Sequence, residues 1–189
     1  MVGVSVLLKL AAERGAVTVL ACAIYGLTLV LMFVSSSAYH AVPVSYGRAK
    51  RALRTLDHSA IFLLIAGTYT ALSLAVPRCP AAFALLGGVW ALSAVGIARR
   101  ARRREHGQTG PIVFYLALAA LVALSLPALA RTLGTQGLLL LSGGGVVYTL
   151  GVPFYLARRL RYHHVIWHAF VLVASALHFL VVLGYVARR

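Results

Sequence analysis

Histidine is the residue type in this sequence with the clearest potential for chemistry, because the chain has seven histidines but only three acidic residues. His164 and His168 are four positions apart and would project from one face of a helix, as two ligands of one metal ion must. This spacing is common by chance and is weak evidence alone. His40, taken alone, is more simply an interfacial anchor at a helix end. His178 is too far along its helix to join His164, and we interpret it as a packing or hydrogen-bonding residue.

An aspartate and a serine could complete a reaction centre. Ser36 lies four residues before His40 and would share its helical face. Asp57 lies directly before the next apolar segment, and the other two acidic residues are Glu13 and Glu105. Its carboxylate could orient a water molecule or accept its proton, while the Ser36 hydroxyl could donate a hydrogen bond to an oxyanion. Asp57 also has a simpler alternative role, because an aspartate just before a helix is a good N-cap.

The composition places these residues in a membrane protein. Of the 189 residues, 61% are hydrophobic and 11% are charged, and the mean hydropathy of +0.91 is too high for a soluble domain. A helix that crosses a bilayer needs about 20 apolar residues. We therefore predict an all-α, polytopic bundle that forms a single membrane domain over residues 1–189. The predicted full spans are 16–40, 59–76, 81–98, 111–130, 137–157 and 165–187, and residues 1–12, too short to span, are the expected remnant of a truncated first helix.

Basic residues alternate along the chain in a way that predicts topology. The segments 41–56, 99–110 and 158–161 each carry several Lys or Arg residues, whereas the segments between them are nearly neutral. Short basic loops stay in the cytoplasm, so we expect these three on the cytoplasmic side of the cell membrane and the C-terminus outside. Only the Arg188–Arg189 pair disagrees. The net charge of +15 therefore reflects membrane topology rather than nucleic-acid binding.

The same topology brings the candidate residues together. The end of the first full span, the start of the next and the start of the last must lie on one side of the membrane. His40, Asp57, His164 and His168 lie at those three places. Three imidazoles are a sufficient protein ligand set for zinc, which in catalytic sites keeps its fourth position for water and can lower the pKa of that water to about 7. Alternatively, zinc could simply pin three helices together.

Three ordered motifs resemble the hemolysin III family. They are Ser36-xxx-His40, the stretch 56–70 that begins Leu-Asp-His-Ser-Ala-Ile, and the sequence His-Val-Ile-Trp-His over 164–168. The glycine-rich stretch 143–151 is also similar. The family is related to the adiponectin and progestin receptors and, more distantly, to alkaline ceramidases. The resemblance covers nearly the whole chain.

The resemblance implies a seven-helix fold with the N-terminus inside. It also implies a zinc ion held by His40, His164 and His168, with Asp57 and Ser36 close to the metal-bound water. Two features depart from the family pattern. Position 71 is Ala where the family usually has Pro, which affects no proposed ligand, and the first helix is largely absent.

The resemblance leaves several functions open, because members of this wider group are described as hemolysins, as receptors and as lipid amidases. Our first expectation is a zinc-dependent hydrolase of an amide or ester bond in a lipid that enters from the bilayer. The alternative is a non-enzymatic cytolysin, or a membrane-homeostasis or sensor protein with structural zinc. The sequence shows no polar stripe through the middle of its spans, which disfavours a monomeric pore or an ion pathway.

Overall fold

The computed structural model describes residues 2–75, 79–102, 109–157 and 159–188, which are helical apart from short turns and contain no strand. This confirms the all-α prediction. A 3₁₀ turn (Ser73–Ala75) follows α3 and a π-helical turn (Leu183–Ala187) follows α7. The α-helices in these residues are α1 (Val2–Ala12), α2 (Ala16–Ala41), α3 (Gly47–Leu72), α4 (Pro80–Arg102), α5 (Thr109–Ala123), α6 (Leu126–Leu156) and α7 (His163–Val182).

Five helical segments among the described residues are long and apolar enough to cross a membrane. They make the chain a polytopic helical membrane protein, in which α1 and α5 are shorter apolar helices. Five of the six predicted full spans overlap these segments. The five segments are Ala16–Ala41, Gly47–Ala75, Pro80–Arg102, Leu126–Leu156 and His163–Ala187.

The predicted span 111–130 crosses the end of α5 at Ala123 and stays a prediction. α5 has 15 residues, about 22 Å of helix, which is shorter than a hydrocarbon core of about 30 Å. Pro127 lies at the start of α6, where its missing N–H leaves no helical bond unmade. Within α6, Gly134 has φ 66° and ψ −177°, a conformation open essentially only to glycine, and it divides the helix.

α3 begins earlier than predicted, at Gly47 rather than near residue 59. Much of the segment 41–56 is therefore helical, because it is rich in the good helix formers Ala, Leu, Lys and Arg. Basic residues mark topology, but they do not end a helix. Asp57 lies ten residues after Gly47, so the alternative role of Asp57 as an N-cap is wrong.

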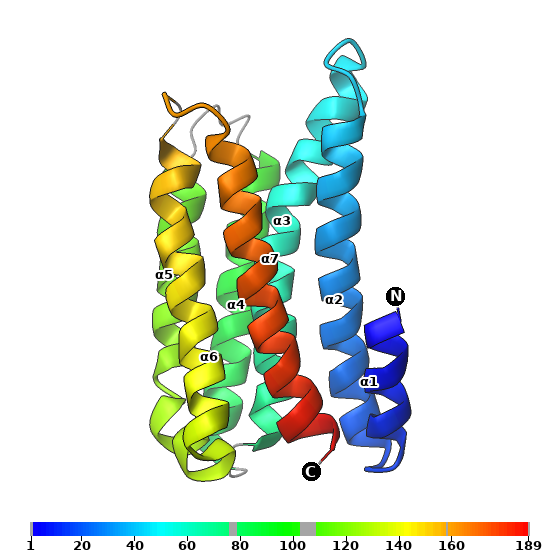
Figure 1. The fold of residues 1–189 in the computed structure, drawn as a ribbon, viewed down its shortest axis with the longest axis vertical. Coiled ribbons are helices and arrows are strands. Elements are labelled where there is room, and N and C mark those ends of the chain that lie inside the picture. Colours follow the sequence, from blue (N-terminus) through cyan, green and yellow to red (C-terminus); the bar gives the residue numbers. More distant parts are fainter. Residues whose placement is uncertain (1, 76–78, 103–108, 158, 189) are drawn as a thin grey trace.

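The helices lie side by side along the long axis of the bundle (Figure 1). α2 packs along α3, and α6 packs along α7. The turn between α2 and α3 lies at the same end as the start of α7, whereas the turns after α1 and α5 lie at the opposite end (Figure 1). The end of α2 and the start of α7 are thereby placed at one end of the bundle.

Small residues allow close packing between helices, as expected in lipid. A Cβ atom at Gly144 of α6 would lie 2.4 Å from the ring of His178 in α7, and one at Gly67 of α3 would lie 2.3 Å from the Thr28 hydroxyl of α2. His178 also donates a hydrogen bond from Nε2 to the carbonyl of Leu141, 3.1 Å away. His178 is therefore both a packing and a hydrogen-bonding residue, as predicted.

This packing makes three adjacent glycines experimentally distinguishable. Gly144→Ala should destabilise the bundle by about 1–3 kcal/mol, because the added methyl group overlaps the His178 ring. Gly143→Ala and Gly145→Ala are matched controls with no neighbouring atom within 4 Å of the added Cβ, and they should be neutral or slightly stabilising. Apparent melting temperatures in detergent provide the measurement, and equal values for the three variants would contradict the packing described.

Candidate metal centre

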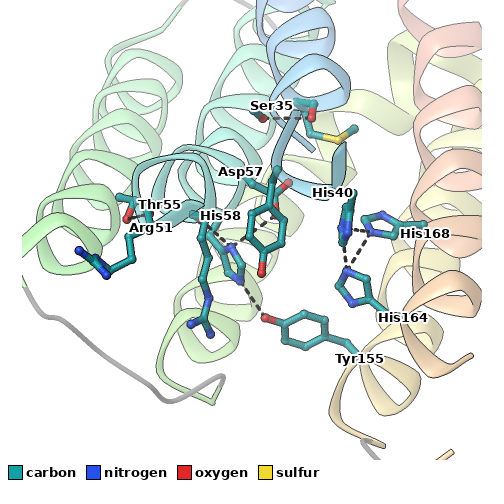
Figure 2. Close-up of polar contacts among 12 residues, drawn as sticks. Ser35, His40, Arg51, Thr55, Asp57, His58, Tyr155, His164 and His168 are labelled. Atoms are coloured by element: carbon teal, nitrogen blue, oxygen red, sulfur yellow. Dashed lines mark hydrogen bonds and ion pairs between the residues drawn. The ribbon is translucent and has the colours of Figure 1, made fainter. Parts of the chain in front are cut away.

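Three imidazole groups meet at one end of the bundle (Figure 2). His40 comes from the last turn of α2, whereas His164 and His168 come from the first turns of α7. The Nε2 atom of His40 lies 3.1 Å from that of His164 and 3.2 Å from that of His168, and the last two atoms are 3.0 Å apart. His40 is exposed and the other two are partly buried, so the group lies at the bundle surface.

The donor set fits a metal ion. A tetrahedral ion with metal–nitrogen distances of about 2.0–2.1 Å separates its nitrogen ligands by about 3.3–3.4 Å, and the observed separations of 3.0–3.2 Å are close to this value. Hydrogen bonds among the three rings would explain this arrangement less well than a shared metal ion, because each N–H···N bond needs one protonated and one unprotonated nitrogen. These three histidines can therefore bind a metal ion. All three lie on α2 and α7, so the ion would join two helices rather than the three expected.

The other two predicted residues lie beside this group. Asp57 projects from α3 near His40, and its side chain is 14% exposed. The Ser36 side chain, one turn before His40 on α2, hydrogen-bonds to the Asp57 carboxylate. The structure thus brings all five predicted residues together at one end of the bundle.

His58 and Tyr155 are neighbours of this site that were not among the predicted site residues. The His58 Nδ1 atom lies 2.8 Å from the carbonyl oxygen of Arg54. Because a carbonyl only accepts, Nδ1 carries the proton, and Nε2 of the neutral ring accepts a hydrogen bond from the Tyr155 hydroxyl at 3.1 Å. The position of His58 directly after Asp57 was a signal in the sequence, whereas Tyr155, 97 residues away, had none.

Arg100 is a buried cation near the same carboxylate. It lies in the last turn of α4 and is 8% exposed. Its guanidinium interacts electrostatically with Asp57 and His58, while Tyr115 donates a hydrogen bond to the His58 carbonyl at 2.8 Å. In the sequence, Arg100 belongs to the basic segment 99–110, which was predicted to be a loop. A buried charge needs partners within the protein, and Arg100 interacts electrostatically with the Asp57 carboxylate.

Stoichiometric metal binding should depend on His40 and His164. We expect about one metal ion per chain in detergent-purified, chelator-washed wild-type protein and almost none in His40→Ala or His164→Ala, because two imidazoles alone form an incomplete site. Elemental mass spectrometry provides the measurement.

His163→Ala is the matched control for this experiment. His163 precedes His164 in α7, but its Nδ1 atom hydrogen-bonds to the carbonyl of Phe154 at 3.2 Å. Its removal should leave the metal content unchanged. A metal-free wild type, or equal metal content in all four proteins, would rule out a site at these histidines.

Known proteins resemble this chain over most of its length. The family described as haemolysin-III related matches residues 1–179. Hemolysin-3 of Bacillus cereus is 34% identical over 168 residues, which are 89% of this chain and 76% of that protein. The Hemolysin-3 homolog of Bacillus subtilis (strain 168) is 35% identical over 162 residues, 86% of this chain and 75% of that protein.

A human protein is also similar, at lower sequence identity. The monocyte to macrophage differentiation factor of Homo sapiens is 29% identical over 173 residues, 87% of this chain and 70% of that protein. No solved structure matches the chain. The family match covers more than nine-tenths of the sequence, including all the residues of the candidate metal centre. The chain therefore belongs to the hemolysin III family.

Proposed function

We propose that this membrane protein is a zinc-dependent hydrolase of an amide or ester bond in a lipid, with His40, His164 and His168 as the zinc ligands. The observation that carries the proposal is a carboxylate, Asp57, next to a group of three histidines at the surface of the bundle. A structural zinc site has four protein ligands, whereas three nitrogen donors leave a coordination position for chemistry.

Zinc is the metal that best suits hydrolysis at these donors. Neutral imidazoles bind several transition metals, but zinc has no redox chemistry and acts as a Lewis acid in many hydrolases. When bound, zinc would supply the Lewis acidity that activates water and polarises a carbonyl group. Because the three imidazoles are neutral donors, they would leave the positive charge of the ion undiminished.

Asp57 is the group that would accept the proton of the attacking water. Its carboxylate is held by the Ser36 side chain and lies 3.5 Å from Nδ1 of His58. These contacts restrict its orientation, which is what a general base requires. Ser36 is the proposed donor to the oxyanion that develops on the substrate carbonyl, once Asp57 has taken up the water proton and no longer needs the single hydroxyl proton of Ser36.

The location of the site supports a lipid as the substrate. The three histidines lie at one end of a bundle whose spans are long and apolar, and His40 is exposed, which favours a substrate that approaches from the bilayer. A shallow apolar hollow follows the outer surface of α2 up to the residue after His40, and an acyl chain fits its chemistry. The hollow is lined by Phe33, Val34, Ser37, Ala38 and Ala41.

We place this end of the bundle on the cytoplasmic side of the cell membrane, with the C-terminus outside and residues 1–189 forming one membrane domain. The support is the distribution of charge. Arg48, Lys50 and Arg51 lie in the first turns of α3, and the last turn of α4 adds three more arginines. Short basic segments next to spanning helices remain in the cytoplasm.

Asp57→Ala should reduce hydrolysis of a fluorescent lipid amide or ester by about 10²–10⁴-fold, because it removes the proton acceptor. Its zinc content should stay close to that of wild type, since Asp57 is not one of the three donors. Turnover and elemental analysis of the same preparation are the measurements.

Glu13→Gln is the matched control, because Glu13 follows α1 at the opposite end of the bundle. It should retain full activity. If Asp57→Ala lost fold and metal together, the carboxylate would be structural, and zinc in a membrane-homeostasis or sensor protein would be the better description.

The name of the Bacillus cereus relative, Hemolysin-3, favours cytolysis as a second candidate function. A cytolysin should release dye from liposomes in proportion to the protein added, and His164→Ala should release as much as wild type if the metal centre takes no part. Absence of release over a wide range of protein-to-lipid ratios would remove this candidate.

A further inference from the structure

Lys50 connects the first turn of α3 to the end of α2. Its Nζ atom donates a hydrogen bond to the carbonyl oxygen of Val42 at 2.7 Å and a second one to the carbonyl oxygen of Tyr39. The same ammonium group lies 4.3 Å from the centroid of the Tyr39 ring. The Lys50 ammonium group thus donates hydrogen bonds to two carbonyls and makes a cation–π contact with one aromatic ring.

The end of α2 needs such a partner because of Pro43. In an α-helix the carbonyl of Tyr39 would accept a hydrogen bond from the N–H of residue 43, but proline has no N–H. The last hydrogen bond of α2 within the helix runs from the Val42 N–H to the Ala38 carbonyl. Lys50 supplies the donor that Pro43 lacks, and its positive charge also complements the negative end of the helix dipole.

This contact lies next to a proposed metal ligand. His40 follows Tyr39 directly, and the two rings meet edge to face with their centroids 4.9 Å apart. Lys50 therefore contacts the backbone before His40 and the aromatic ring that packs against its imidazole. His40 is exposed and lies in the last turn of its helix, the part of a helix that frays most readily.

We propose that Lys50 is a positioning residue that holds the last turn of α2 so that His40 meets His164 and His168. The metal-binding part of this inference rests on the proposed zinc site. A frayed turn would leave only a fraction of molecules with His40 in place, and the apparent metal affinity falls by that fraction. Nothing in this role requires Lys50 to touch the metal or a substrate.

The test is a zinc titration of chelator-treated protein in detergent, repeated with cobalt(II) for its visible spectrum. Lys50→Met keeps the length of the side chain but removes its charge and donors, and it should weaken metal binding about tenfold, the equivalent of roughly one charged hydrogen bond. The cobalt spectrum at saturation should be unchanged, because the ligands are the same. Lys50→Arg should restore most of the affinity.

Arg51→Met is the matched control. Arg51 is the next residue of α3 and carries the same charge, but its side chain is exposed, so its loss should not alter metal affinity. Tyr39→Leu tests the aromatic contact separately, because it keeps the backbone carbonyl that Lys50 binds. It should produce a smaller loss of affinity than Lys50→Met.

Hydrogen exchange of the metal-free proteins provides a second readout that does not depend on zinc. Lys50→Met should speed exchange of the amides in residues 36–42 while leaving α4–α7 unchanged, and Arg51→Met should match wild type. Equal affinity and equal exchange in Lys50→Met and Arg51→Met would overturn the positioning role. Faster exchange throughout Lys50→Met, without rescue by Lys50→Arg, would also overturn it, because the residue would then stabilise the whole bundle.

The two readouts separate this inference from the proposed function. If wild type bound no zinc, the metal site would fail, yet faster exchange confined to residues 36–42 would still establish that Lys50 holds the last turn of α2. If wild type bound zinc and Lys50→Met bound it equally well with unaltered exchange, the metal site would stand and the role of Lys50 would fail.

Discussion

The meeting of three imidazole nitrogens at 3.0–3.2 Å constrains the rest of this bundle. It requires α2 to end and α7 to begin at the same depth and on the same side. Both conditions follow from an alternating arrangement of helices, in which the turn after α2 and the start of α7 share one end (Figure 1). Close packing through glycine then fixes the distances between neighbouring helices.

Several polar groups around this end hydrogen-bond to one another. His58 links the Arg54 carbonyl to the Tyr155 hydroxyl, and Tyr115 binds the His58 carbonyl. In an apolar environment each unpaired polar group would be costly. The same contacts therefore join α3 to α5 and to the end of α6 beside Asp57.

The proximity of the three histidines could be predicted from the sequence because the signals were local or topological. Spacing paired His164 with His168, and the distribution of basic residues placed His40 at the same end. Asp57 was located correctly but was given an alternative role as an N-cap, which the earlier start of α3 excludes. The basic residues of segment 41–56 were interpreted as a loop, but its high helix propensity was the better guide, because α3 begins at Gly47.

Other features could not be predicted because they depend on contacts between distant segments. Tyr155 and Arg100 belong to the site only through packing with α3, and neither has a distinctive sequence neighbourhood. The division between α5 and α6, in contrast, had a signal in the sequence, because Pro127 marks the start of a new helix. The hydrophobicity of 111–130 outweighed that signal in the prediction.

The distribution of the donors also bears on how such a protein is assembled. Ser36, His40 and Asp57 lie on one helical hairpin made of α2 and α3, whereas His164 follows His40 by 124 positions. A nascent chain that has inserted only this hairpin holds one of the three nitrogens and has little ability to capture an ion. Tight capture of a metal ion by these histidines would therefore require the insertion of α7, and it would couple the acquisition of the metal to the completion of the membrane bundle.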